Sequence, residues 1–291
     1  MSEWVVGFVG TGLLGYPMAE RLAAEGNEVH AWNRTLEKAL PLRDEGVVVS
    51  KDASDVFERA PITILMLSDA AAIREVLFER VGTERLAGKT LVQMGTIGPW
   101  ESRDLAKELR ALGAEYVEAP VLGSIPEARA GRLIVMCGSS RDQFERLSPL
   151  FEVFGPGPRY VGEVGAAATL KLALNHLIAA HLAAFSQSLG LVRRSGLSID
   201  LFMEVLRNSS LHAKVFDKKL PLLLERDFSN PHFPTKHLLK DLRLFHRAAS
   251  DAGVATEAAS SLVGVLERAV DLGVGDLDYS SLYVAIDPAE E

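Results

Sequence analysis

The chain reads Val5-Val6-Gly7-Phe8-Val9-Gly10-Thr11-Gly12-Leu13-Leu14-Gly15-Tyr16-Pro17-Met18-Ala19 in the stretch that decides its fold. An apolar strand runs directly into three glycines, and a helix pattern follows at once. In such a turn Gly10 permits the tight bend, Gly12 lets a ligand approach the main chain, and Gly15 lets the helix press on the strand. Free N–H groups at the helix N-terminus attract an anion. A βα turn without a ligand is the alternative, but the flanking strand and helix favour a dinucleotide site. We expect this site to include Gly10, Thr11, Gly12, Leu13, Leu14 and Gly15.

Composition sets the protein class. The 291 residues are 48% hydrophobic and 24% charged, as in ordinary globular proteins, and a chain of this size usually splits into two domains. A net charge of −8 argues against a nucleic-acid partner. The single cysteine, Cys137, lies in an apolar run and is expected to be a small buried hydrophobe. We find no apolar run of membrane-spanning length and no basic leader, so we expect a cytoplasmic protein without a membrane partner.

The first half of the chain alternates short apolar runs with amphipathic helix patterns, which predicts a mostly parallel sheet covered on both faces. We therefore expect a Rossmann domain, a doubly wound α/β sheet, over residues 1–162. The expected strands are Trp4–Val9, Glu28–Trp32, Ile62–Leu67, Lys89–Gln93, Glu115–Val117, Leu133–Cys137 and Arg159–Tyr160. The expected helices include Tyr16–Glu25, Thr35–Glu45, Ala70–Arg80 and Pro99–Leu112.

Beyond Gly162 the pattern becomes helical, which predicts an all-α domain over residues 163–291. The stretch from Val164 to Arg193 lacks proline, and apolar residues surround nearly the whole helix between Leu170 and Leu191. A helix that is apolar all round must be buried on all sides. We expect other helices, or another subunit of a homodimer or homotetramer, to cover it. The polar tail from Asp287 onward is expected to be mobile.

The choice of dinucleotide depends on the residues after the second expected strand, Asn33, Arg34 and Thr35. Enzymes that use NAD usually carry Asp or Glu near this point to hold the ribose hydroxyls, and neither occurs here. An arginine instead pairs with a 2′-phosphate. The three residues therefore favour NADP over NAD. The alternative is a solvated loop in which Thr35 caps a helix.

Four stretches in order along nearly the whole chain resemble the β-hydroxyacid dehydrogenases, which include 3-hydroxyisobutyrate dehydrogenase and glyoxylate/succinic semialdehyde reductase. These enzymes are similar in fold to 6-phosphogluconate dehydrogenase. The stretches are Gly10 to Ala19, Glu118-Ala119-Pro120-Val121-Leu122-Gly123-Ser124, Gly162-Glu163-Val164-Gly165 leading to Lys171 and Asn175, and Phe233 leading to Lys240-Asp241.

The resemblance implies that Lys171 and Asn175 are catalytic and contact the substrate. Their spacing of four places them on one helix face. Hydride transfer to a carbonyl leaves negative charge on oxygen, which a positioned ammonium stabilises and protonates. A surface lysine is the alternative, but Lys171 lies within an apolar run.

Further roles follow from the same resemblance. Thr96 is expected at the nicotinamide ribose or the substrate, although Gly95 stands where the family usually has Ser. Leu122 likewise replaces the usual Ser of the substrate loop, which puts the substrate itself in question. The remaining cofactor contacts expected are Met66, Leu67 and Lys240. The remaining substrate contacts expected are Gly123, Ser124, Phe233 and Asp241.

Together these observations predict NADPH-dependent reduction of a small aldehyde acid of the glyoxylate or succinic semialdehyde type to the hydroxy acid. Oxidation of a 3-hydroxyisobutyrate-type acid and imine reduction are the enzymatic alternatives. A dinucleotide-binding assembly module without turnover is the alternative of another class. No metal is expected, because His176 and His181, like His232 and His237, are five residues apart, a poor spacing for shared ligation on a helix.

Overall fold

The computed structural model describes residues 4–289, which form two compact units. The first unit ends at Lys171 and the second begins at Leu172. The sequence pattern places this boundary at residue 162, where strand signals stop. The structure places it inside a long helix, because the first turns of that helix pack with the sheet that precedes them.

The first unit is built around one sheet with the order β3-β2-β1-β4-β5-β6-β8-β7, in which β9 pairs with β8. Pairing is parallel from β3 through β6 and antiparallel between β6 and β8. The strands are β1 (Val5–Val9), β2 (Glu28–Trp32), β3 (Val48–Val49), β4 (Ile62–Leu65), β5 (Thr90–Gln93), β6 (Glu115–Glu118), β7 (Val121–Leu122), β8 (Ile134–Gly138) and β9 (Arg159–Gly162).

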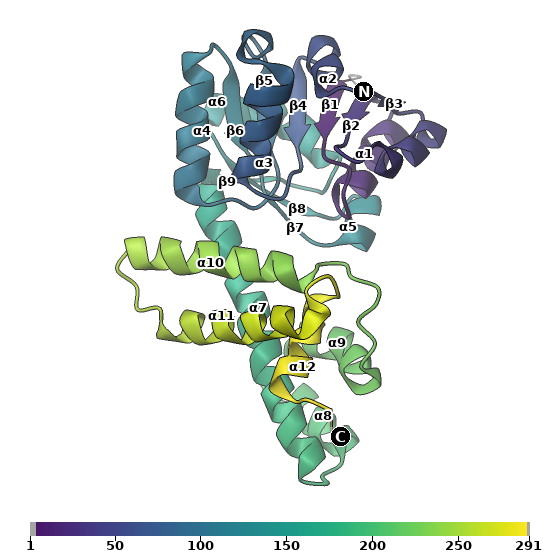
Figure 1. Ribbon diagram of the computed structural model, residues 1–291, viewed down its shortest axis with the longest axis vertical. Coiled ribbons are helices and arrows are strands. Elements are labelled where there is room, and N and C mark those ends of the chain that lie inside the picture. Colours follow the sequence, from purple (N-terminus) through teal and green to yellow (C-terminus); the bar gives the residue numbers. More distant parts are fainter. Residues whose placement is uncertain (1–3, 290–291) are drawn as a thin grey trace. The chain divides into compact units, whose positions relative to one another are not determined.

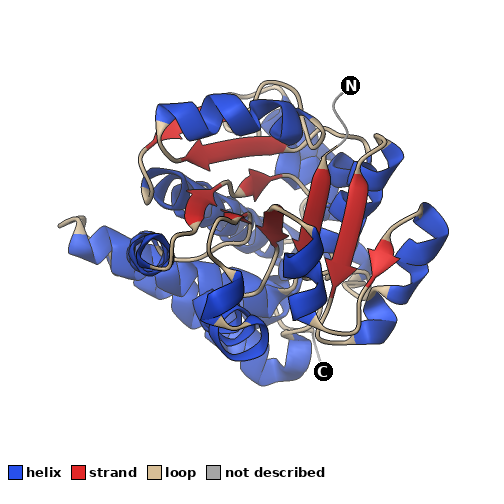
Figure 2. Ribbon diagram, turned by 90° about the horizontal axis from the view of Figure 1, so that it is seen from above, coloured by secondary structure: helices blue, strands red, loops and turns tan. Residues whose placement is uncertain are grey.

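Helices cover both faces of this sheet (Figures 1 and 2). One apolar core joins the sheet to α1 and α6, with Phe8, Met18 and Phe151 fully buried. A second core on the opposite face joins it to α2, α3 and α4, with Phe57 and Leu105 fully buried. The doubly wound Rossmann architecture is thus confirmed. The helices are α1 (Gly15–Ala24), α2 (Ala53–Arg59), α3 (Ala70–Arg74), α4 (Pro99–Ala111), α5 (Ile125–Arg129) and α6 (Arg141–Glu152).

Two expected helices take other forms. The helix expected over Thr35–Glu45 is a pair of 3₁₀ segments, Leu36–Lys38 and Leu40–Glu45, with a proline at the start of the second. Proline lacks the N–H that a continuing α-helix needs, so the first segment cannot extend into the second. The helix expected over Ala70–Arg80 changes after α3 into a π-helix, Glu75–Val81.

The second unit is helical, as expected. Its core includes Leu182, Phe185, Leu238 and Tyr283. Helices α10 and α11 lie side by side (Figure 1). The helices are α7 (Ala166–Arg194), which begins in the first unit, α8 (Ile199–Arg207), α9 (Lys214–Glu225), α10 (Thr235–Asp251), α11 (Glu257–Ala269) and α12 (Leu282–Ile286).

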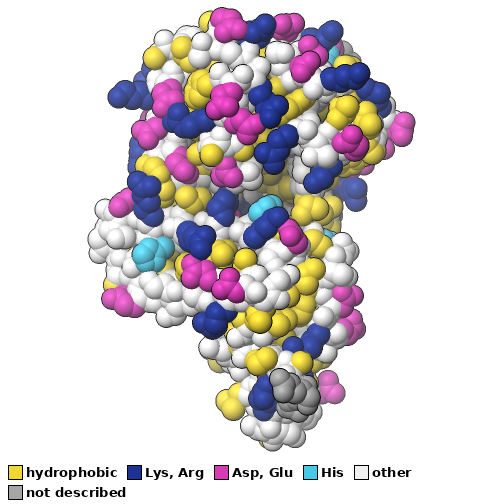
Figure 3. Space-filling model, viewed as in Figure 1, with side chains coloured by type: hydrophobic (Ala, Val, Ile, Leu, Met, Phe, Trp, Pro, Cys, Tyr) yellow, Lys and Arg dark blue, Asp and Glu magenta, His cyan; other side chains and the backbone are white. Residues whose placement is uncertain are grey.

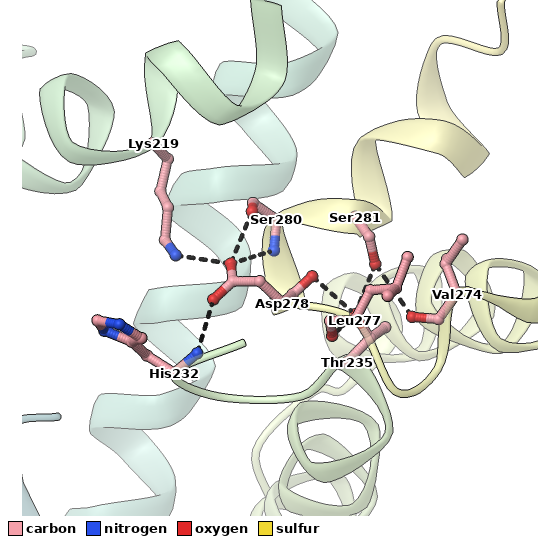
Figure 4. Close-up of polar contacts among 8 residues, drawn as sticks. All are labelled: Lys219, His232, Thr235, Val274, Leu277, Asp278, Ser280 and Ser281. Atoms are coloured by element: carbon pink, nitrogen blue, oxygen red, sulfur yellow. Dashed lines mark hydrogen bonds and ion pairs between the residues drawn. The ribbon is translucent and has the colours of Figure 1, made fainter. Parts of the chain in front are cut away.

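A buried ion pair holds the start of α10 in place (Figure 4). Lys219 Nζ lies 2.6 Å from Asp278 Oδ1, and both side chains are almost completely buried. The other oxygen of Asp278 accepts the His232 N–H at 3.3 Å. The Thr235 hydroxyl contacts the carbonyl oxygens of Leu277 and Asp278. These contacts fix the chain on both sides of Phe233 and the first turn of α10.

The expectation of a mobile tail is wrong at Asp287, whose side chain is buried. Its carboxylate accepts hydrogen bonds from Arg193, Arg194 and Tyr283 at 2.7–2.8 Å. Burial raises the pKa of Asp287, but these donors and the two arginine charges outweigh it and lower the pKa below its usual range. Residues 290 and 291 lie outside the described part of the chain.

Within one chain the other helices do not cover α7 on all sides, and its cover by another subunit stays a prediction. Leu177 is 49% and Leu191 is 69% exposed, while Leu182 and Leu189 are buried. By length and composition α7, alone among the described residues, is long and apolar enough to cross a membrane, so the expectation of no apolar run of that length is wrong at this helix. Core helices of folded domains meet the same criterion, and α7 contributes several residues to the core of the helical unit.

Candidate active site

The glycine loop between β1 and α1 has the shape that a dinucleotide requires. Gly10 has φ +98°, and a Cβ there would lie 2.3 Å from the Met66 carbonyl oxygen. A Cβ at Gly15 would lie 2.0 Å from the Gly10 carbonyl oxygen, so the helix can approach the turn only without one. A Cβ at Gly12 would meet no atom within 4 Å, which leaves the main chain open to a ligand. The loop therefore fits a bound diphosphate.

Asn33 fixes this loop from the end of β2. Its Oδ1 accepts the Thr11 N–H at 3.0 Å, and its Nδ2 donates to the Thr35 carbonyl at 2.8 Å. The Gly10 N–H also donates to the Trp32 carbonyl at 2.9 Å. The Thr11 hydroxyl is buried without a hydrogen-bond partner among the described residues. The structure thus brings Asn33 and Thr35 to the glycine loop, with the Asn33 amide committed to shaping it.

Arg34 is well placed to reach a ligand from solvent. Its side chain is 73% exposed, and its nearest carboxylate is Glu75, with Arg34 Nη1 and Glu75 Oε2 3.9 Å apart. Glu75 makes a shorter bridge of 2.6 Å to Arg80. The Arg34 contact is too long and too exposed to hold the guanidinium firmly.

The ends of β4 and β5 lie against the same loop. A Cβ built on Gly10 would lie 3.0 Å from Leu67 Cδ2, so Met66 and Leu67 both border the glycine turn. A Cβ at Gly95 would lie 2.5 Å from the Leu67 carbonyl oxygen. This close approach of two backbones gives a physical reason for glycine, rather than serine, before Thr96. Thr96 itself is half-buried.

The loop after β7 is shaped by its own contacts. Gly123 has φ +136°, and a Cβ there would lie 2.6 Å from Leu133 Cδ2. The Ser124 hydroxyl donates to Glu127 Oε2 at 2.7 Å as part of the cap of α5. Leu122 is half-buried and pairs with Ile134 in the sheet. The hydroxyl proton of Ser124 is therefore engaged with Glu127, and a contact of Ser124 with the substrate stays a prediction.

Lys171 and Asn175 lie one turn apart on α7, which confirms the helix that their spacing predicts. Lys171 is half-buried, and Asn175 is only 2% exposed. Asn175 Nδ2 donates to Asp241 Oδ2 at 2.7 Å, while Asn175 Oδ1 has no hydrogen-bond partner among the described residues. Lys240 Nζ lies 3.0 Å from Asp241 Oδ1. Phe233 packs at 5.9 Å from Tyr279, measured between ring centroids.

Glu118, at the end of β6, is a residue whose role the sequence did not reveal. It is only 2% exposed, yet it carries a carboxylate. Burial raises its pKa, and hydrogen bonds from Ser102 and from backbone N–H groups of α7 oppose that rise. A charged residue closing an apolar strand directly before Ala119-Pro120 was the available signal, but its partners lie far away in sequence.

Other features lie apart from these residues. A groove of about 460 Å³ is lined by Arg103, Lys107 and Arg110 of α4 together with Glu163 and Val164, and by none of the predicted site residues. Cys137 is buried as expected, and burial raises the pKa of its thiol to about 11. Among residues 4–289 no group of three His, Cys, Asp or Glu side chains could hold a metal ion.

Comparison with known families agrees with this geometry. Residues 5–165 match the NAD binding domain of 6-phosphogluconate dehydrogenase. Residues 165–286 match the NAD-binding domain of NADP-dependent 3-hydroxyisobutyrate dehydrogenase. The fold and the glycine loop thus define an oxidoreductase that uses a nicotinamide dinucleotide. The chain belongs to the β-hydroxyacid dehydrogenase family.

Individual relatives cover nearly the whole chain. Glyoxylate/succinic semialdehyde reductase 1 of Arabidopsis thaliana is 34% identical over 97% of this chain and 98% of its own length. The 2-hydroxy-3-oxopropionate reductase of Escherichia coli is 30% identical over 97% of both chains. The crystal structure of a 3-hydroxyisobutyrate dehydrogenase from Salmonella typhimurium shares the fold, with a TM-score of 0.87, 24% identity and coverage of 97% of this chain and 99% of that one.

Proposed function

We propose that the protein reduces a small aldehyde acid, of the glyoxylate or succinic semialdehyde type, to the hydroxy acid with NADPH. The observation that carries this proposal is the pair Lys171 and Asn175, one turn apart on α7, with the Asn175 side chain buried and its Oδ1 without a hydrogen-bond partner among the described residues. A buried amide oxygen that finds no protein donor is suited to a ligand hydroxyl. The relative from Arabidopsis supports the substrate class.

The chemistry assigned to these side chains is acid catalysis. NADPH, when bound, supplies the hydride. The Lys171 ammonium stabilises the negative charge that develops on the substrate oxygen and donates a proton from Nζ to it. Asn175 Oδ1 accepts a hydrogen bond from this oxygen once it is protonated, and so holds the hydroxyl of the hydroxy acid. Asp241 fixes the Asn175 amide by accepting from its Nδ2, which leaves Oδ1 for the ligand.

The preference for NADPH over NADH is supported by the residues after β2. No carboxylate stands at Asn33, Arg34 or Thr35 to bind ribose hydroxyls and repel a 2′-phosphate. The exposed guanidinium of Arg34 can turn toward such a phosphate at little cost, because its bridge to Glu75 is 3.9 Å long.

Oxidation of NADPH by the purified protein tests the reaction. The panel contains glyoxylate, succinic semialdehyde, 2-hydroxy-3-oxopropionate and a cyclic imine, and the reverse assay contains 3-hydroxyisobutyrate with NADP⁺. We expect turnover to be fastest with one of the aldehyde acids. Faster turnover of the imine or of the hydroxy acid would contradict the proposal. Tight NADPH binding without turnover across the panel would indicate a binding module instead.

We also propose that the protein is a homodimer or homotetramer joined through the helical unit. Exposed apolar residues recur at heptad spacing along α7, at Leu170, Leu177, Ala184 and Leu191. Hydrophobic side chains also gather on the face of this unit seen in Figure 3. A stripe of this kind is suited to packing against a second helix. Light scattering on the wild type and on Leu177→Glu should show loss of the oligomer in the variant, and a monomeric wild type would contradict the proposal.

A further inference from the structure

One carboxylate joins the end of β6 to the first turn of α7. Glu118 Oε1 accepts the N–H groups of Gly165, Ala167 and Ala168 at 2.7, 2.8 and 3.3 Å. Its other oxygen, Oε2, accepts the Ser102 hydroxyl at 2.5 Å. The first N–H groups of a helix have no partner within the helix, so this side chain supplies the acceptor that they need. A negative charge at this end also stabilises the helix dipole.

A glycine opposite Glu118 in the sheet makes room for its carboxylate. A Cβ at Gly138, its partner in the antiparallel pairing of β6 and β8, would lie 2.2 Å from Glu118 Oε1. Gly165 has φ +100°, and a Cβ there would lie 2.3 Å from Arg103 Nη1. Two glycines thus make room for the carboxylate and for the turn that it binds. The Glu118 carboxylate therefore holds the start of the helix against the end of β6.

Lys171 follows Ala167 by one helical turn, and both belong to the first compact unit. An α-helix is stiff over one turn, so a shift or rotation of its first turn moves the Lys171 side chain with it. We propose that Glu118 is a positioning residue, which sets where the Lys171 amine lies by fixing the first turn of α7. The consequence for catalysis rests on the function proposed above for Lys171.

Two substitutions test the length and the charge of the Glu118 side chain separately. Glu118→Asp keeps the charge but shortens the side chain by one C–C bond, about 1.5 Å, so it cannot bind Ser102 and the α7 amides together. Glu118→Gln keeps the length and an acceptor oxygen but removes the charge. Because a misplacement of about 1 Å can cost roughly 100-fold in rate, we expect kcat to fall about 10- to 100-fold in Glu118→Asp and less in Glu118→Gln. The Kd for NADPH should stay within about twofold of the wild-type value in both, because neither substitution alters the glycine loop.

Two measurements do not depend on turnover. Mass-spectrometric labelling of lysines with acetic anhydride should show changed Lys171 reactivity in Glu118→Asp. Hydrogen exchange should be faster in that variant at the Ala167 and Ala168 amides. If the wild type turns over no substrate, the function proposed above fails, whereas labelling and exchange still decide whether Glu118 positions Lys171.

Glu108 provides the matched control. Its carboxylate is also hydrogen-bonded through both oxygens, in this case to the Arg74 guanidinium at 2.7 and 2.8 Å, but on the partly exposed face of α4. Glu108→Asp and Glu108→Gln should leave kcat and Lys171 labelling unchanged. A folded Glu118→Asp with wild-type kcat and wild-type labelling would overturn the inference. If Glu118→Asp does not fold, Glu118→Gln decides, and unchanged exchange together with unchanged labelling there would overturn it.

Discussion

Asn175 Nδ2 lies 2.7 Å from Asp241 Oδ2, and this buried hydrogen bond ties α7 to α10 inside the helical unit. Both side chains are about 2% exposed. The bond gives the amide a fixed orientation, since Nδ2 is committed to the carboxylate and Oδ1 faces away from it. Asn175 is therefore held by Asp241, which lies 66 positions later in the sequence.

A double-mutant cycle on this pair should show strong coupling. Asn175→Ala and Asp241→Ala each lose the same charge-assisted hydrogen bond. The double variant should therefore lose less free energy of unfolding than the two single variants lose together. We expect a coupling of about 1.5–3 kcal/mol in the free energy of unfolding by urea. The same cycle between Asp241→Ala and Ser186→Ala, a buried serine elsewhere on α7, should be additive. Additive effects for the Asn175 pair would contradict the structure.

Loss of the Lys171 amine should abolish chemistry while sparing the cofactor. We expect Lys171→Ala to lower kcat by about 10²–10⁴-fold, the range of general acid catalysis, with NADPH affinity unchanged by fluorescence titration. Lys218→Ala, which removes an exposed lysine of α9, should match the wild type. Turnover near the wild-type value in Lys171→Ala would remove this residue from the reaction.

Arg34 should discriminate between the two cofactors. Arg34→Ala removes the charge expected to pair with the 2′-phosphate, so Kd for NADPH should rise about tenfold, a loss of about 1.4 kcal/mol. The Kd for NADH should change little, because NADH lacks that phosphate. Arg59→Ala, which removes an exposed arginine at the end of α2, is the control. Equal changes for both cofactors would assign Arg34 another role.

Two glycines of the same loop should respond differently to alanine. A Cβ at Gly12 meets open space, so Gly12→Ala should keep the melting temperature but weaken cofactor binding at least tenfold, since the methyl occupies the ligand's place. A Cβ at Gly15 would lie 2.0 Å from the Gly10 carbonyl oxygen. Gly15→Ala should therefore lower the free energy of unfolding by about 1–3 kcal/mol or more. Thermal unfolding and NADPH titration on both variants test this contrast. Unweakened binding in Gly12→Ala would show that the loop does not hold the diphosphate.

Asp287 should make stability depend on acid pH. Its folded-state pKa lies below the unfolded value of about 3.9, so its contribution is complete above that value and is lost as pH falls through the folded pKa. Asp287→Asn should lower the free energy of unfolding by about 2 kcal/mol at pH 7, and the difference from wild type should shrink as pH falls below the unfolded pKa of about 3.9. Urea unfolding at a series of pH values measures this. Asp251→Asn, an exposed aspartate of α10, should show no such trend.

Features set by local pattern could be predicted from the sequence. The glycine loop is flanked directly by a strand and a helix pattern, which identifies it. The alternation of strand and helix patterns predicted the doubly wound sheet. The helix that carries Lys171 and Asn175 could be predicted because its apolar context is visible in one short stretch, whereas their catalytic role is implied by the family resemblance and stays a prediction. The helix expected over Thr35–Glu45 failed for an equally local reason, since the proline near the start of its second half prevents continuation.

Features that depend on distant partners could not be predicted. Glu118 bonds to amides 47–50 positions away, and Asp287 meets arginines more than 90 positions before it. Polar residues at such positions look like solvated termini or strand ends until the chain is folded. The reason for glycine instead of serine before Thr96 could not be predicted either. Only the folded chain shows that the Leu67 carbonyl leaves no room for a side chain at Gly95.

The link between Asp287 and the two arginines at the end of α7 also bears on how the polypeptide matures. During synthesis α7 leaves the ribosome long before residue 287 does, and domains generally fold in the order in which they emerge. Until that aspartate appears, Arg193 and Arg194 lack the buried acceptor that they share in the native state. The last contacts of the helical unit can therefore form only after residue 287 has been made, and in nascent chains stalled before it the end of α7 should be more open to proteolysis.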